Sequence, residues 1–284
     1  MRRTELIELH DHPRFPARLR DLMTDTLQEL WRFGNSYGAI LPQLHRGLTA
    51  AGVSAADAPS PPKPAGEQVD VLDLCSGGGG PWPRLARDLE RDYGLAVRVC
   101  LTDKYPNLQA LARPRSAEEE THLDYVPQPV DAAHVHPALS GFRTIFSSFH
   151  HFSPTEAREV LRSAMTANRG IGIFELARRE LKTVLVLCLA PLLVLLLTPR
   201  MRPFRWSRLL WTYVVPVIPF VIWFDGLVSC LRAYAPEELQ EMLAQLGSEP
   251  TGLSQASYRW FLGEERSGLL PVTYLIGYPE MSPP

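Results

Sequence analysis

The sequence predicts an α/β protein built on a doubly wound, mostly parallel seven-stranded sheet with helices on both faces. Short apolar runs of strand type alternate with helical patterns over most of the chain, which is typical of parallel βαβ units. The first of these runs ends in a cluster of glycines. Only a short reversal separates the last two runs, so we expect these strands to be antiparallel neighbours, with the last strand antiparallel in the sheet.

The expected elements follow one another in a regular order. Strands are predicted at residues 69–74, 97–103, 143–149, 170–176, 257–263 and 270–278, with one further short strand within 123–132. Helical patterns cover residues 83–92, 106–112, 154–168 and 236–246. The clearest helix start is at Ser153, where a capping serine precedes Pro154 and the early acid Glu156.

Two segments stand outside this alternation. Apolar residues from Leu19 to Trp31 recur at steps of three and four, which predicts a helical N-terminal extension over residues 16–52. A linker rich in Ala, Pro and Ser follows at residues 53–66. We therefore expect a helical cap and linker at 1–66, a Rossmann-like core at 67–181 and 232–284, and an apolar helical insert after the fifth strand at 182–231.

Composition narrows the class of protein. The chain has 284 residues with a formal net charge of −2, and no basic tail stands out, so we expect no nucleic-acid partner. None of the four cysteines has the spacing of a zinc site, so we expect free thiols and no metal. The first residues, MRRTELIELHDHPRF, contain no apolar core of a secretory signal, so the catalytic part is expected to face the cytoplasm.

The glycine cluster carries the strongest chemical signal. Asp73 ends the first strand, and Cys75, Ser76, Gly77, Gly78, Gly79 and Gly80 follow it. Glycines at a strand-to-helix turn let a ligand approach the backbone without meeting side chains. Asp103 ends the second strand 24 residues after Gly79, where a carboxylate can accept hydrogen bonds from two ribose hydroxyls.

This pair of features resembles the class I S-adenosylmethionine-dependent methyltransferase family. Asp73 matches the acid at the end of the first strand, and Gly77 and Gly79 match the second and third glycines of the turn, while Cys75 replaces the first. The resemblance, which covers about 67–180 and 232–278, implies S-adenosyl-L-methionine as cofactor. It implies that Asp73 lies near the methionine amino group, the glycine turn lies against the cofactor, and Asp103 binds the ribose.

Further segments extend the resemblance. Residues 130–132 resemble the stretch after the third strand, where an acid contacts the adenine amino group, and residues 146–152 resemble the fourth-strand motif that lines the methyl-transfer site. The expected cofactor-binding residues are therefore Asp73, Cys75, Ser76, Gly77, Gly78, Gly79, Asp103, Lys104, Asp131, Ala132 and Ser147.

Three residues are candidates for catalysis. His150 or His151 is placed to deprotonate an acceptor hydroxyl, because the pKa of histidine lies near neutrality. Each histidine equally suits a packing or hydrogen-bonding role behind the cofactor. Glu175 ends the fifth strand and points toward the same edge of the sheet. Methyl transfer often needs only alignment of the acceptor with the sulfonium, so a dedicated base is not required.

Two other functions compete with methyl transfer. A dinucleotide-binding oxidoreductase would place a diphosphate at the helix start, where Asp73 would repel it, so the cationic S-adenosylmethionine is the better match. A non-catalytic, membrane-attached relative that keeps the nucleoside pocket has the same binding residues. Turnover separates this relative from an enzyme.

The insert predicts contact with a membrane. Residues 184–198 and 209–224 carry no charge, and four arginines lie between them. As helices of 15 and 16 residues, each would be about 22–24 Å long, shorter than the roughly 30 Å hydrocarbon core. A spanning hairpin would also place the arginines outside. We expect apolar helices that dip into the cytoplasmic leaflet, with a spanning hairpin or a soluble lid or dimer surface as alternatives.

The expected position of the apolar insert predicts the kind of methyl acceptor. In the expected fold the insert lies beside the strand ends that hold the cofactor. A small lipophilic acceptor, such as a quinone, an isoprenoid or a lipid-like precursor, would then enter from the membrane. Asp225 and Arg232 close the insert and are expected to fix its return to the core.

Overall fold

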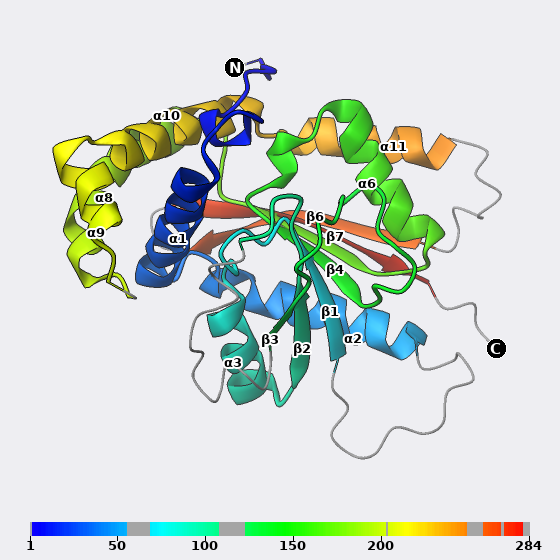
Figure 1. Ribbon diagram of the computed structural model, residues 1–284. Helices are drawn as coiled ribbons and strands as arrows, with labels where there is room; N and C mark the ends of the chain where they lie inside the picture. The colour runs from blue at the N-terminus through cyan, green and yellow to red at the C-terminus, as the bar shows by residue number, and fades with distance from the viewer. Residues whose placement is uncertain are drawn as a thin grey trace.

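The computed structural model describes residues 2–55, 69–107, 123–202, 204–248, 258–267 and 270–280 (Figure 1). A central sheet lies between two layers of helices, and a further group of helices projects from one edge of the sheet. This arrangement is the α/β class that the sequence predicts.

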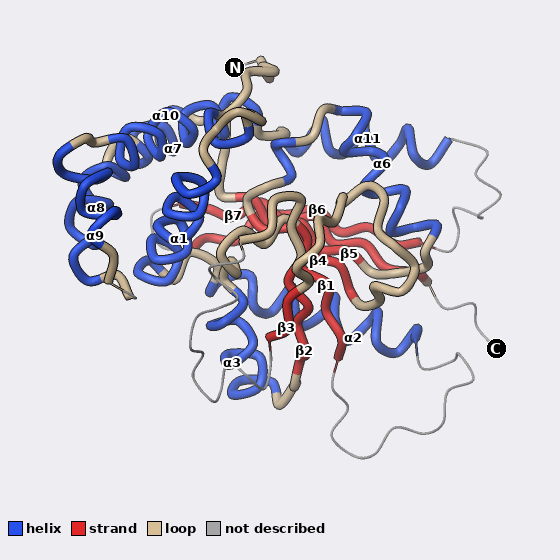
Figure 2. Tube along the Cα trace, viewed as in Figure 1, coloured by secondary structure: helices blue, strands red, loops and turns tan. Residues whose placement is uncertain are grey.

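The sheet has seven strands in the order β3-β2-β1-β4-β5-β7-β6 (Figure 2). They are β1 Val69–Leu74, β2 Val97–Leu101, β3 Leu123–Tyr125, β4 Phe142–Phe146, β5 Ile171–Glu175, β6 Tyr258–Ser267 and β7 Leu270–Pro279. Strands β1 to β5 pair in parallel, and β7 is antiparallel to both β5 and β6. The predicted parallel sheet with an antiparallel last strand is confirmed.

Two helix pairs cover the two faces of the sheet. Helices α2 (Leu41–Ala55) and α3 (Trp82–Tyr93) lie on one face, and α6 (Pro154–Thr166) and α11 (Pro236–Ser248) lie on the other. Each face has its own apolar core, one around Phe146 and Phe174 and one around Ile145 and Ile173. Each strand contributes side chains to both cores, because neighbouring side chains of a strand point to opposite faces of the sheet.

The N-terminal extension divides into two parts with different roles. Helix α1 (Ala17–Gly34) ends at Asn35, which has a left-handed backbone with φ of 45°. The chain then passes through a short 3-10 turn, Gly38–Ile40, into α2. Helix α2 packs into the core of the sheet, so only the segment before it lies apart, unlike the expected cap over 1–66. Residues 56–66 of the expected linker and most of the expected helix 106–112 lie outside the described residues.

The insert forms a helical hairpin that packs beside α1 (Figure 1). Its elements are α7 Leu181–Leu187, α8 Ala190–Leu197, a 3-10 turn Thr198–Arg200, α9 Trp206–Leu209, a π-helical turn Leu210–Val214 and α10 Val217–Arg232. The first arm runs for 20 residues from Leu181 to Arg200. The sequence-based length of 15 residues was therefore too short, because helical backbone continues past the uncharged stretch at both ends.

A buried ion pair joins the hairpin to α1. Asp25 and Arg208 are both almost fully buried, and the Arg208 guanidinium lies 3.3 Å from the Asp25 carboxylate. Arg205 approaches the same carboxylate at 3.8 Å. Arg208 of the arginine-rich turn thus points into the protein, where it neutralises a buried acid.

The ion pair predicts a large effect on stability. Asp25→Ala leaves the Arg208 charge buried without its carboxylate, which should lower the free energy of unfolding by about 3–5 kcal/mol. Urea unfolding followed by circular dichroism measures this loss. Arg202→Ala, which removes an exposed arginine from the same turn, is the control and should change stability by less than about 0.5 kcal/mol. Equal stabilities of the two variants would contradict the role of the pair.

Candidate functional site

The candidate site lies at the carboxyl edge of the parallel strands. Strands β1, β2, β4 and β5 all end at this edge because they run in parallel. Three segments predicted to bind the cofactor or acceptor follow directly from these ends, namely residues 75–80, 102–104 and 147–151. The backbone amide of Thr102 donates to the carbonyl of Asp73, at 2.8 Å, so the first two segments start side by side.

Asp73 lies near the end of β1, buried beneath this edge. Its carboxylate is buried and accepts a hydrogen bond of 2.6 Å from the Thr144 hydroxyl of β4. The Trp82 indole N–H in turn donates to Thr144, at 3.3 Å. Burial raises the pKa of Asp73 to about 7, against the lowering effect of the Thr144, Ser76 and Trp82 side chains. The carboxyl group therefore changes charge near neutral pH.

Asp103 joins the end of β2 to the glycine turn. One of its carboxylate oxygens accepts from the Gly77 amide and the other from the Tyr105 amide, each at 2.7 Å. Burial raises the pKa of this group, and the two amide donors oppose that rise. Asp73 and Asp103 thus lie on the same side of the sheet, on either side of one turn.

Helix α1 packs directly against the glycine turn, which leaves no room for side chains there. A Cβ atom added to Gly78 would lie 3.2 Å from the Thr24 carbonyl, and one added to Gly79 would lie 3.1 Å from the Gln28 amide. Gly77, Gly79 and Gly80 also have positive φ angles. The glycines therefore meet two demands, the left-handed turn and the close approach of α1.

Two residues next to the strand ends have left-handed backbones although they are not glycine. Cys75 follows β1 with φ of 59°, and Ser147 follows β4 with φ of 43°. Such conformations are uncommon outside glycine, asparagine and aspartate, and they cluster at functional sites. Ser147 is held there by hydrogen bonds from the Tyr37 hydroxyl, at 2.6 Å, and from the Leu176 amide, at 3.2 Å.

The start of helix α3 has few free amide donors. Pro81 precedes the helix and Pro83 is its second residue, and neither has a backbone N–H. The amides of Arg84 and Leu85 both donate to the Pro81 carbonyl. A phosphate bound at a helix start needs such donors, so this start is poorly suited to a diphosphate.

The remaining residues expected to bind the cofactor are Lys104, Asp131 and Ala132. The backbone amide of Val130 donates to the Asp103 carbonyl, at 2.9 Å, which brings Asp131 to this edge. The Asp131 carboxylate is half-exposed and accepts from the Ala133 amide, at 2.9 Å. Ala132 is buried in the α6 face of the core, and Lys104 is exposed.

His150 and Glu175 form a buried pair behind the fourth-strand motif. The His150 Nδ1 lies 2.8 Å from Glu175, and its Nε2 lies 3.3 Å from Glu8. Burial lowers the pKa of His150, but the two carboxylates outweigh burial and raise it to about 10. Glu175 also accepts from the Phe149 amide, at 2.6 Å. Of the two roles expected for His150, this geometry favours hydrogen bonding behind the site over proton abstraction.

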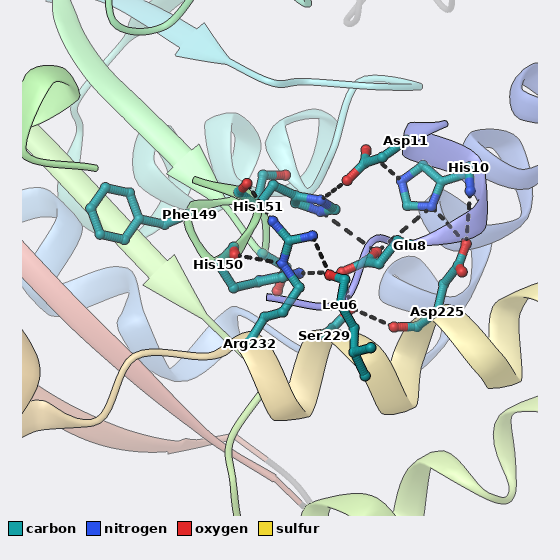
Figure 3. A network of polar contacts seen from close by, with 12 residues as sticks. Leu6, Glu8, His10, Asp11, Phe149, His150, His151, Asp225, Ser229 and Arg232 are labelled. Atoms are coloured by element: carbon teal, nitrogen blue, oxygen red, sulfur yellow. Dashed lines mark hydrogen bonds and ion pairs between the residues drawn. The ribbon is translucent and has the colours of Figure 1, made fainter. Parts of the chain in front are cut away.

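His151 is partly exposed and faces the N-terminal segment (Figure 3). Its Nδ1 lies 2.6 Å from Asp11, and its Nε2 lies 3.8 Å from Glu8. Next to it, His10 Nδ1 lies 2.8 Å from Asp225 of α10. We name the group the N-terminal polar cluster; it comprises Glu8, His10, Asp11, His150, His151, Glu175, Asp225 and Arg232.

The two residues expected to close the insert hold this cluster together. Asp225 accepts from the Leu9 amide, at 2.7 Å, and Arg232 donates to the carbonyls of Leu6 and His150, at 2.7 and 3.0 Å. Glu8, His10 and Asp11 were not among the predicted site residues. The only feature of the sequence that marks these three residues is the polar stretch ELHDH at residues 8–12, and such a stretch is typical of a solvated terminus.

A groove lies at the opposite edge of the sheet. This open groove of about 910 Å³ is lined by α2, the end of α3 and the strand ends of β6 and β7, including Arg46, Tyr93 and Arg259. The carboxyl end of β7 lies there because β7 runs antiparallel to β5. The groove is thus separate from the glycine turn and from every residue predicted for the site.

Comparison with known proteins gives similarity in structure only. No family model matches the chain, and no curated protein matches it. Human N-acetylserotonin methyltransferase with S-adenosylmethionine is 13% identical over 94% of this chain and 57% of that one, with a TM-score of 0.48. Magnesium protoporphyrin IX methyltransferase from Synechocystis PCC 6803 is 15% identical over 93% and 99%, with a TM-score of 0.41.

A dehydrogenase also resembles the chain. A protein assigned as a Zn-dependent alcohol dehydrogenase, from Rhodobacter sphaeroides, is 10% identical over 97% of this chain and 100% of that one, with a TM-score of 0.47. The chain spans about half the length of the first three structures it matches, at 57%, 48% and 46%. These likenesses concern the fold. The strand order of the chain itself defines a Rossmann-like α/β fold of the class I methyltransferase type.

The buried Asp73 predicts a pH dependence of stability. Its folded pKa of about 7 exceeds the ordinary 3.8, so the folded state binds more protons between pH 4 and 7 and loses stability as pH rises through this window. The loss should reach about 2–4 kcal/mol. In Asp73→Asn this contribution should vanish. Urea unfolding of both proteins from pH 4 to 8 measures the difference, and parallel profiles would contradict the assignment.

Proposed function

We propose that this chain is an S-adenosylmethionine-dependent methyltransferase that acts on a small lipophilic acceptor at the cytoplasmic surface of a membrane. The observation that carries the proposal is the pairing of Asp73 and Asp103 on either side of one glycine turn, with Asp103 accepting from Gly77 at 2.7 Å. Two carboxylates around bare backbone suit a cationic nucleoside with an ammonium and a sulfonium group.

The same turn disfavours a nicotinamide cofactor. Asp73 would repel a diphosphate, and Pro81 and Pro83 remove donors that would bind it. This chemistry favours methyl transfer over the oxidoreductase alternative, although a dehydrogenase is among the similar structures. A binding protein without turnover shares the cofactor site and is distinguished by the absence of product.

Exposed apolar side chains on the hairpin support the membrane part of the proposal. Among the described residues, the helix Leu181–Arg200 is long and apolar enough to cross a membrane. Only 17% of its most apolar stretch of 18 residues is buried. A second apolar stretch, Trp206–Val214 with Val217–Arg232, is bent by 70°. The exposed apolar residues of the hairpin are Leu181, Leu185, Leu189, Leu192, Leu196, Phe204, Trp206, Leu210, Tyr213, Val214, Val215 and Phe220.

This pattern suits insertion into one leaflet. The bend of 70° between the two parts of the second arm is too sharp for a straight crossing, and Trp206 at the tip is 77% exposed, as an interfacial aromatic would be. An exposed apolar surface formed by so many large side chains is unusual for a soluble monomer. Helix α1 packs both on the hairpin and on the glycine turn, so the expected cofactor site lies within one helix of the apolar surface.

Titration calorimetry tests the cofactor assignment. We expect the chain to bind S-adenosylmethionine and its demethylated product but not NAD. Asp103→Ala should weaken binding by roughly 1.5–3 kcal/mol, because it removes charge-assisted hydrogen bonds. Asp92→Ala, which removes an exposed carboxylate from α3, is the control and should bind as the unaltered chain does. NAD binding, or an unchanged affinity in Asp103→Ala, would overturn the assignment.

Liposome flotation tests the membrane assignment. The unaltered chain should float with vesicles of neutral and anionic phospholipid. Leu185→Glu combined with Leu192→Glu places two charges on exposed positions of the first arm, so it should abolish flotation without unfolding the protein. Tyr93→Glu places a charge on the surface of α3 and should float normally. A chain that ignores lipid and is a dimer in solution would support a dimer surface instead.

A further inference from the structure

Three donor side chains outside the expected cofactor site converge in the N-terminal polar cluster. One ligand-type atom from each of Glu8, His10 and His151 lies within 4.8 Å of the other two. The Glu8 Oε2 atom is 3.7 Å from the Nδ1 of His10 and 3.8 Å from the Nε2 of His151 (Figure 3). We propose that these three residues form a binding site for a zinc ion.

The spacing of the donors suits the ion. Zinc bound to histidine nitrogen and carboxylate oxygen at about 2.0–2.1 Å places tetrahedral donors roughly 3.4 Å from one another. The Glu8 Oε2 atom lies 3.8 Å from the Nε2 of His151, only a few tenths of an ångström more than this value, and the ligand atoms of all three residues lie within 4.8 Å of one another. Side-chain torsions of a partly exposed histidine can supply that contraction.

Each histidine is oriented by a second carboxylate. Asp225 holds the Nδ1 of His10 at 2.8 Å, and Asp11 holds the Nδ1 of His151 at 2.6 Å. In metal sites the ligating imidazole characteristically donates its other N–H to a carboxylate, which fixes the ring and raises its basicity. The Nε2 atoms of both rings lie beyond hydrogen-bond distance of their nearest acidic oxygens, which are 3.7 and 3.8 Å away.

The third ligand is oriented in the same way. Glu8 is 1% exposed, and its Oε1 atom accepts from the Ser229 hydroxyl at 3.0 Å and lies 3.3 Å from His150. Its Oε2 atom is thereby directed toward the two imidazoles. Buried charges are paired or coordinate metals, and Oε2 is the oxygen of Glu8 left for an ion once Oε1 contacts Ser229 and His150.

The charges of the cluster leave room for a dication. It holds four carboxylates, Glu8, Asp11, Glu175 and Asp225, around the guanidinium of Arg232 and the three histidines. This excess of carboxylates favours a bound cation. Two imidazoles and one carboxylate suit zinc, whereas Mg²⁺ and Ca²⁺ prefer oxygen donors.

Three protein ligands leave one coordination position open, as in catalytic rather than structural zinc sites. His151 belongs to the segment after β4 that the sequence assigns to methyl transfer. This last step rests on the proposed function: the open position would take an oxygen atom of the acceptor and orient it toward the cofactor.

Zinc binding to the purified 284-residue chain, without any cofactor, tests the site. Calorimetry should show one Zn²⁺ per chain, and Co²⁺ should give the intense visible absorption of a tetrahedral site. His151→Ala should lower zinc affinity at least 100-fold, and Asp225→Asn, which changes a residue that orients His10 without being a ligand, roughly 10–100-fold. His134→Ala, which alters an exposed histidine elsewhere, should bind zinc normally.

His10→Ala provides a second variant if His151→Ala does not fold, since circular dichroism monitors folding of each. Absence of stoichiometric zinc binding, binding unchanged in both histidine variants, or a weak octahedral cobalt spectrum would each overturn the proposal. S-adenosylmethionine affinity is measured separately, so a chain that binds zinc but no cofactor disproves the proposed function and leaves the metal site intact.

Discussion

The packing of residues 2–34 over the carboxyl edge of the sheet is the constraint on which the candidate site depends. Helix α1 contacts the glycine turn through Thr24 and Gln28, and the segment before it supplies Glu8, His10 and Asp11. The sheet alone would present an open row of strand ends. The N-terminal segment turns that row into a partly enclosed site, because it buries carboxylates and histidines that the core could not satisfy by itself.

The insert holds this segment in place from the other side. Asp225 binds the backbone at Leu9, Arg232 binds the carbonyl of Leu6, and Arg208 neutralises Asp25 inside α1. The apolar hairpin is therefore joined to the N-terminal segment by hydrogen bonds and a buried ion pair, and through that segment to the residues around His151.

Local patterns in the sequence predicted the parts of the fold that depend on local physics. Strand runs, the cap at Ser153 and the glycine turn after Asp73 follow from periodicity and backbone freedom, and the structure has each of them. The zinc-type cluster could not be predicted, because positions 8, 10 and 151 meet only after the chain has folded. Likewise, no spacing rule indicates that Arg208 of an apolar insert is buried against an acid of α1, or that α2 belongs to the core.

The left-handed backbones of Cys75 and Ser147 have a consequence for the floor of the site. Each residue follows a central strand, and β1 and β4 are neighbours, so the two kinks lie side by side. Each costs on the order of 1 kcal/mol or more in an L-amino acid. The rest of the fold supplies that energy, and the hydrogen bonds from Tyr37 and Leu176 hold the strained backbone at Ser147. The backbone at the strand ends is therefore pre-organised, so a ligand that fits it would not have to reorder it.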